Sequence, residues 1–139
     1  MRFLHNDVEY TIPDEWWDDA RMKTFKPKRR SYRSCPSPYS GLRLFEVAIT
    51  DVQPLDRKGS HGVFNDAGAG RREGTARERV LRVLKWFQAD SPVEPVCVSR
   101  TGGEGKYRFR LTQGAHRFYC AVASGFSHVP AVEEDSESG

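Results

Sequence analysis

Residues 111–132 read LTQGAHRFYCAVASGFSHVPAV, and this stretch decides the fold. Gly114 interrupts an alternating apolar and polar run, and the residues that follow it have the composition of a helix. Gly125 stands where a left-handed residue closes a helix, and Phe126 is placed to make the hydrophobic contact that accompanies such a cap. We therefore expect a strand, a turn, a helix over residues 116–124 and a last strand over residues 129–132.

Three further segments predict strands that join this unit. Residues 42–49 and residues 107–111 alternate apolar and polar side chains, which is the period-two pattern of a half-buried strand. Residues 95–99 form a short β-branched run that suits a buried strand. We expect residues 95–99 and 107–111 to pair as a hairpin.

The clearest helix in the chain begins at Thr75. Thr75 and Glu78 have the spacing of a capping box, in which each side chain bonds a backbone amide of the first turn. Apolar residues then recur at three- and four-residue steps, at Val80, Val83, Leu84 and Phe87. Arg79, Arg82 and Lys85 are expected to point away from this apolar face.

The first forty residues have a different character. Residues 2–12 read as a β-hairpin that turns at Asn6 and Asp7, and Pro13 with the acids after it predicts a short helix. An extended basic arm follows, with no acid between Arg21 and Arg33. Its other cations are Lys23, Lys26, Lys28, Arg29 and Arg30.

The order of elements predicts an α+β fold in which a compact mixed β-sheet carries packed helices. We divide the chain into an N-terminal hairpin, short helix and basic arm at 1–40, a core domain at 41–133, and a disordered acidic tail at 134–139. A length of 139 residues with 37% hydrophobic and 29% charged residues suits one globular core, and the net charge of +3 is small.

Several functional classes do not fit the composition. No apolar run reaches the roughly 20 residues of a membrane helix, and the N-terminus lacks the apolar core of a signal peptide, so we expect a cytoplasmic protein without membrane contact. The three cysteines are too scattered for a disulfide framework or a Cys-x-x-Cys zinc site. His116 and Cys120 lie one helical turn apart, but without a third ligand nearby we expect no metal site. Cys120 is expected to be a buried thiol.

Residues 111–132 resemble the signature region of the ParB/sulfiredoxin superfamily. The likeness lies in the Gly114-Ala115-His116-Arg117 turn after a strand, the helix that ends at Gly125, and the Val129-Pro130-Ala131-Val132 strand. Upstream features fall in the same order, so the resemblance covers about residues 42–133. It implies a ParB/sulfiredoxin-like fold for this part of the chain.

The resemblance also implies a ligand site. In the superfamily, the residues that match His116 and Arg117 contact nucleotide phosphates, and an arginine near the position of Arg57 lies by the nucleotide or a partner. Helix N-termini bind anions through unpaired amides and a partial positive charge, and a glycine such as Gly114 lets a phosphate approach the backbone. We expect Gly114, Ala115, His116, Arg117 and Arg57 to bind a phosphate-bearing ligand such as ATP or CTP with Mg²⁺. The alternative is a tight turn whose arginine pairs with a carboxylate.

Two departures from the family narrow the expected activity. Ala115 occupies the position of the sulfiredoxin catalytic cysteine, so sulfinic acid reduction is not expected. The sequence shows no helix-turn-helix domain after Val132, so operator binding of the ParB kind is not expected either. Nucleotide hydrolysis or phosphoryl transfer stays open, since no acid is singled out by spacing among Asp51, Asp56, Asp66, Glu73 and Glu78.

Two alternatives to a nucleotide-binding domain remain open. In one, the cations Lys23, Lys26, Lys28, Arg29, Arg30 and Arg33 contact DNA or RNA, with the rings of Phe25, Tyr32 and Tyr39 available for stacking, as in a nuclease-like module. The same arm could instead be a solvated extension, or lie across the core with Trp16 and Trp17 as anchors. In the other alternative, the chain is a catalytically inactive interaction subunit. The glycine-rich loop at 59–72 is expected to be a surface loop and not a P-loop.

Overall fold

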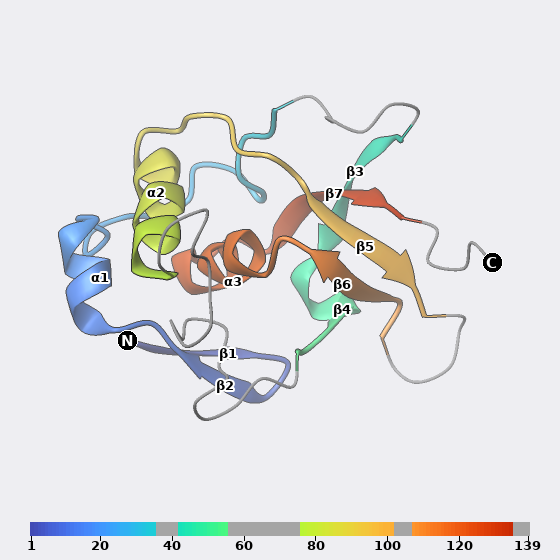
Figure 1. The fold of residues 1–139 in the computed structure, drawn as a ribbon, viewed down its shortest axis with the longest axis horizontal. Helices are drawn as coiled ribbons and strands as arrows, with labels where there is room; N and C mark the ends of the chain where they lie inside the picture. Colours follow the sequence, from blue (N-terminus) through green and yellow to red (C-terminus); the bar gives the residue numbers. More distant parts are fainter. Residues whose placement is uncertain (36–41, 56–75, 102–106, 135–139) are drawn as a thin grey trace.

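A computed structural model describes residues 1–35, 42–55, 76–101 and 107–134. The fold is α+β, as the sequence predicts, and the described residues form three α-helices, a five-stranded sheet and a separate two-stranded hairpin (Figure 1). The elements in chain order are β1 (Arg2–His5), β2 (Val8–Thr11), α1 (Asp14–Asp19), β3 (Leu44–Ala48), the 3-10 helix η1 (Ile49–Asp51), β4 (Val52–Gln53), α2 (Ala76–Gln88), β5 (Val96–Arg100), β6 (Phe109–Gln113), α3 (Ala115–Ser124) and β7 (His128–Glu133).

The five-stranded sheet is mixed and curled. Its strand order is β3-β7-β5-β6-β4, in which β7 is antiparallel to β3 and parallel to β5, while β6 is antiparallel to β5 and parallel to β4. The rings of Phe45 on β3 and Phe109 on β6 lie 6.0 Å apart although two strands separate these strands in the sheet. The sheet must therefore bend round, because a flat sheet would hold the two rings much farther apart.

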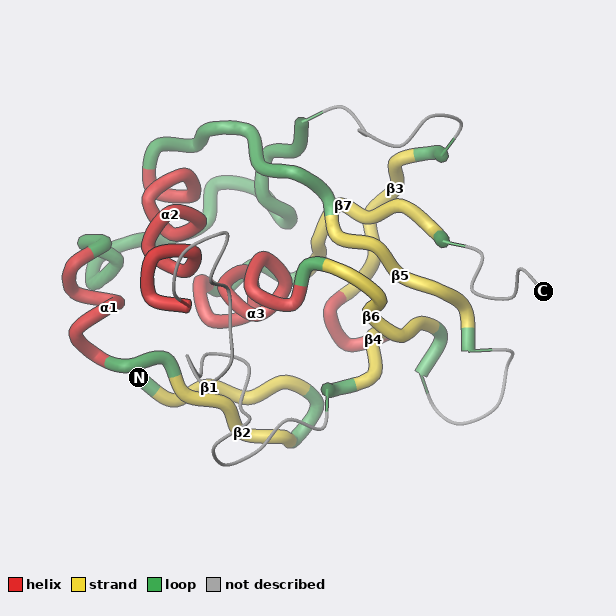
Figure 2. The backbone as a smooth tube through the Cα atoms, viewed as in Figure 1, coloured by secondary structure: helices red, strands yellow, loops and turns green. Residues whose placement is uncertain are grey.

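The helices lie to one side of this sheet, and α3 lies between α2 and the β1-β2 hairpin (Figure 2). The predicted apolar face of α2 is buried, including Val80, Leu84 and Phe87. Gly125 closes α3 in the left-handed conformation at φ 100°, and the amide of Phe126 bonds the carbonyl of Ala121 at 3.2 Å. The predicted cap is confirmed, with Phe126 buried as expected.

A closed polar network joins the hairpin to α3 and to the end of β4. His5 is buried, and its ring bonds the Tyr119 hydroxyl through Nδ1 and the Ile49 carbonyl through Nε2, each at 3.0 Å. The Tyr119 hydroxyl also accepts the amide of Leu55 at 3.0 Å, and the Tyr10 hydroxyl donates to the carbonyl of Leu55 at 2.7 Å. These bonds fix the hairpin in place although it lies outside the main sheet.

The basic arm lies across the core and is not a solvated extension. It forms no regular helix or strand within the described residues 21–35, as expected, and Ser34 makes a single bridge with Val93. Met22 and Tyr32 are almost fully buried, and both belong to the same hydrophobic cluster as Val80 and Val129. The physical reason is that burial of the large side chains of Met22 and Tyr32 stabilises this packed position, and a solvated arm would leave both exposed to water.

Two other details differ from the sequence prediction. The two residues of β4 add a fifth strand beside β6, where we expected only the end of the preceding strand. Glu134 belongs to the fold and not to a disordered tail, because its amide bonds the Val98 carbonyl at 2.7 Å and its carboxylate accepts bonds from Thr112 and Gln113. Thr75, the loop at 59–72 and the tail at 135–139 lie outside the described residues.

Within the described part of the chain, no helix has the length and apolar character needed to cross a membrane. Cys35, Cys97 and Cys120 are free thiols, and Cys120 is fully buried as expected. Burial raises the pKa of the Cys120 thiol well above its ordinary value, which keeps the sulfur protonated and unreactive.

Candidate functional site

A cavity of about 690 Å³ lies where α2 faces the start of α3. The predicted turn contributes four of its lining residues, Gly114, Ala115, His116 and Arg117. The rest of the described lining comes from the end of the basic arm, from α2 and from the segment before β5, namely Cys35, Arg79, Arg82, Val83, Trp86, Pro92, Val93 and Glu94. The site predicted from sequence therefore forms one wall of a larger chamber.

The turn lies at the start of a helix, as the sequence predicts. Gly114 is the N-cap of α3 at φ 94°, a left-handed conformation that glycine adopts without steric cost. Its carbonyl accepts the first intrahelical bond, from the amide of Phe118 at 2.8 Å. The first turn of α3 carries no acidic side chain. Its positive end is thus not neutralised by an acid from its own first turn.

The space beside Gly114 holds the guanidinium of Arg117. A Cβ at Gly114 would lie 2.8 Å from Nη2 of Arg117 and 3.1 Å from Cγ1 of Val96. The left-handed backbone therefore favours glycine here, and a larger residue would also displace the Arg117 guanidinium from its place. The sequence predicts a tight turn and ligand access at Gly114, but neither the left-handed angle nor the approach of Arg117.

Arg117 is anchored on the segment before β5. Its Nη2 donates to the carbonyl of Pro95 at 3.3 Å, and its Nη1 lies 3.7 Å from Oε1 of Glu94. The Nε atom is buried and has no hydrogen-bond partner among the described residues. The arginine thus pairs with a carboxylate, as in the alternative interpretation of the turn, but at a long distance and with donor capacity left over.

Tyr32 packs between α2 and the segment that carries Glu94. Its hydroxyl donates to the carbonyl of Glu94 at 2.7 Å, and its ring stacks on Phe87 of α2 with the ring centroids 5.1 Å apart. Burial raises the pKa of the Tyr32 phenol far above its ordinary value, and the nearby charge of Arg117 opposes this only in part. The phenol therefore stays a neutral donor that holds Glu94 and Arg117 in position.

The positive charge of the cavity comes mainly from residues that the sequence analysis placed elsewhere. Arg79 and Arg82 line the cavity from α2, so the expectation that both simply point away from the core missed their role as lining residues. Trp86 lines it too, and 41% of its surface is exposed. Residues 79, 82 and 86 recur at steps of three and four, and this second helical stripe is the signal that could have identified them.

The described lining of the cavity holds three arginines, one histidine and a single acid, Glu94. Three fixed positive charges and a helix N-terminus around one chamber attract an anion, and guanidinium groups match phosphate oxygens geometrically. No group of three or more His, Cys, Asp or Glu side chains suited to a metal ion occurs among the residues that the structure describes.

The remaining predicted site residues divide into two sets. Arg57 lies outside the described residues, as do Asp56, Asp66 and Glu73, while Asp51 and Glu78 do not line the cavity. The six cations of the nucleic-acid alternative are all exposed, namely Lys23, Lys26, Lys28, Arg29, Arg30 and Arg33. Of the rings proposed for stacking, Tyr32 is buried, Phe25 is half-buried and Tyr39 lies outside the described residues.

Comparison of the chain with models of protein families, with curated proteins and with solved structures gives no match. The likeness to ParB and sulfiredoxin proteins therefore rests on the sequence motif alone, and the chemistry of the site rests on the residues that line the cavity.

Proposed function

We propose that this protein binds a nucleotide or another phosphate-bearing ligand in the cavity between α2 and α3, in the manner of a ParB/sulfiredoxin-like domain. One observation carries the proposal: Arg79, Arg82 and Arg117 come from two helices and converge with the start of α3 on a chamber that has one acid in its described lining. Guanidinium groups match phosphate oxygens in geometry and carry the opposite charge, so an anionic ligand fits this lining.

The size and the lining of the cavity also support a ligand of nucleotide size. Its volume of about 690 Å³ lies within the range of roughly 300–1,000 Å³ of small-molecule sites. The phosphate groups would lie toward the arginines and the amides of α3. The exposed ring of Trp86 offers a face on which a planar base can stack.

The proposal covers binding and no chemical step. Phosphoryl transfer needs a group that positions the nucleophile and usually carboxylates that hold Mg²⁺. The described lining offers Glu94 alone, and Arg117 lies beside it. ATP and CTP with Mg²⁺ remain the candidate ligands that the family resemblance suggests.

Thermal unfolding in the presence of ATP, CTP or inorganic phosphate, each with and without Mg²⁺, tests the proposal. A ligand present at 100 times its Kd adds about 2.7 kcal/mol to the free energy of unfolding, which is readily seen as a higher Tm. Arg82→Ala should weaken binding about tenfold or more, because it removes a charged donor from the cavity. Lys85→Ala is the matched control, since it removes an exposed cation from the same helix but not from the cavity lining.

The two variants separate a specific site from general charge attraction. Equal losses of affinity in Arg82→Ala and Lys85→Ala would mean that the anion is held by overall charge and not by the cavity. The absence of any shift with all of the probes would overturn the proposal.

A further inference from the structure

The basic arm gives the molecule a second cationic surface, distinct from the cavity lined by Arg117. We use "basic segment" for residues 21–35, in which seven cations occur without an acid. Arg29 pairs with Asp90 at 3.0 Å and Arg30 pairs with Glu46 at 2.5 Å. Lys23, Lys26, Lys28 and Arg33 are exposed and form no ion pair with the described residues. Their charge is available to a partner.

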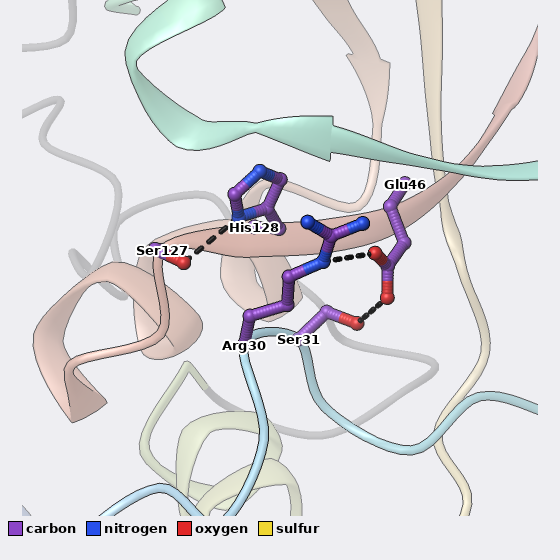
Figure 3. A network of polar contacts seen from close by, with 5 residues as sticks. All are labelled: Arg30, Ser31, Glu46, Ser127 and His128. Atoms are coloured by element: carbon purple, nitrogen blue, oxygen red, sulfur yellow. Dashed lines mark hydrogen bonds and ion pairs between the residues drawn. The ribbon is translucent and has the colours of Figure 1, made fainter.

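The basic segment is held in a defined shape. Ser31 and Arg30 both donate to the carboxylate of Glu46 on β3, at 2.7 and 2.5 Å, and Figure 3 shows the two side chains meeting that carboxylate. The carbonyl of Arg30 accepts the amides of Ser127 and His128, at 3.1 and 2.9 Å. A binding partner would therefore meet cations on a fixed backbone and would not have to order this stretch of chain.

A small pocket lies among these cations. Its volume is about 310 Å³, and Thr24, Phe25, Lys26, Lys28 and Arg29 line it from the basic segment. Its other lining residues are Phe87, Gln88, Asp90 and Phe126. The half-buried ring of Phe25 lies 6.0 Å from the ring of Phe126, with the planes tilted by 56°. The pocket thus combines an aromatic interior with lysines and an arginine around it.

We propose that the basic segment binds single-stranded nucleic acid, with phosphates along the exposed lysines and one unstacked base in the Phe25 pocket. Nonspecific single-strand binding sites combine cations that follow the backbone with aromatic rings that stack the bases. A duplex keeps its bases stacked inside, so it cannot fill the pocket. A run of acidic side chains would satisfy the lysines but would leave the pocket without an aromatic base to stack on its rings.

This inference does not depend on the proposed function. The residues that line the Phe25 pocket and those that line the cavity between α2 and α3 are different residues. Arg82→Ala should therefore leave single-strand binding unchanged. The two proposals can succeed or fail separately.

Fluorescence anisotropy of a labelled single-stranded oligonucleotide with the full chain, across a series of salt concentrations, measures the interaction. The double variant Lys26→Gln/Lys28→Gln should lower the slope of log affinity against log salt by about 1.4, since each lost phosphate contact contributes about 0.7. Arg108→Gln/Arg110→Gln is the matched control, because it removes two exposed cations at the same spacing from outside the segment. The control should keep the wild-type slope.

Phe25→Leu tests the pocket, since it keeps an apolar side chain but removes the ring. Loss of one stacked base should weaken single-strand binding by about fivefold or more, with Tm measured to confirm that the fold is intact. Three results would overturn the inference: equal slopes in the two double variants, duplex binding as tight as single-strand binding, or competition by polyglutamate as effective as that by unlabelled oligonucleotide. The last result would identify an acidic protein segment as the partner.

Discussion

The two sides of α3 carry polar groups in opposite states. On the side of the hairpin, His5 and Tyr119 are buried, neutral and bonded to one another and to Ile49 and Leu55. At the start of the helix, Arg117 belongs to a cavity with two further arginines and one acid in its described lining. The first arrangement is satisfied by hydrogen bonds within the chain, whereas the described lining of the second has more cations than acids.

This difference separates stability from binding. A buried network whose members bond one another stabilises one packing and has no capacity left for a ligand. Charges of one sign around an open chamber cost stability in the free protein and gain it back when an anion arrives. Substitutions in the first region should therefore change unfolding, and substitutions in the second should mainly change affinity.

Removal of the two buried phenol groups should give the largest and most direct contrast. Tyr119→Phe leaves His5 and the amide of Leu55 without their partner, and each buried polar group left unsatisfied costs about 1–3 kcal/mol. Tyr32→Phe leaves the carbonyl of Glu94 without a donor and removes a contact with the Arg117 guanidinium. We expect Tyr119→Phe to lower the free energy of unfolding by about 3 kcal/mol and Tyr32→Phe by about 1 kcal/mol in urea titrations. Equal losses of unfolding free energy in the two variants would show that the larger hydrogen-bond network around Tyr119 stabilises the fold no more than the contacts of Tyr32 do.

The two helix-capping glycines provide an intermediate test. Gly114 and Gly125 both have left-handed backbones, so alanine at either position should cost about 1–2 kcal/mol. An added Cβ at Gly114 meets the guanidinium of Arg117 at 2.8 Å, whereas at Gly125 the nearest atom is 3.4 Å away, on Pro27. Only Gly114→Ala should also weaken phosphate or nucleotide binding. Calorimetric titration of both variants with the ligand measures this. Equal affinities of Gly114→Ala and Gly125→Ala would show that ligand binding does not depend on where the Arg117 guanidinium lies.

A decrease in pH should have the smallest effect on stability, and it should act through protonation of His5. Burial lowers the pKa of His5 below its ordinary value of 6.5. The unfolded chain therefore takes up a proton on His5 at a higher pH than the folded chain does. Above pH 6.5, His5 is neutral in both states and does not reduce the free energy of unfolding. As the pH falls below 6.5 toward the lowered pKa, the unfolded chain binds the proton first, so the free energy of unfolding decreases. Melting curves between about pH 7.5 and 5.5 should show this decrease in the wild type and lose it in His5→Gln; the same slope in both would contradict the assignment.

The sequence predicted those elements whose signals are local. Asn6 and Asp7 adopt positive φ angles in the hairpin turn. The capping-box spacing of Thr75 and Glu78 predicted a helix start within a residue of Ala76, where the described part of α2 begins. The predicted closure of α3 at Gly125 is also confirmed. In each case, neighbouring residues alone specify the backbone conformation.

Features that depend on distant contacts could not be predicted in the same way. Met22 and Tyr32 lie in an irregular segment without periodicity, so nothing in the sequence indicates that both enter the core. The two residues of β4 are too few to show an alternating pattern. Arg79 and Arg82 read as a polar helix face, and only the packing of α2 beside α3 makes that face one wall of the cavity.

The position of β7 has a consequence for how the protein is made. This strand lies between β3 and β5 in the sheet, yet it is the last strand of the described chain to leave the ribosome. Until it emerges, β3 has no neighbour in the sheet and β5 lacks one of its two, so the sheet cannot be completed before β7 has left the ribosome. The edges of β3 and β5 stay open during this interval, and open strand edges can pair with other chains.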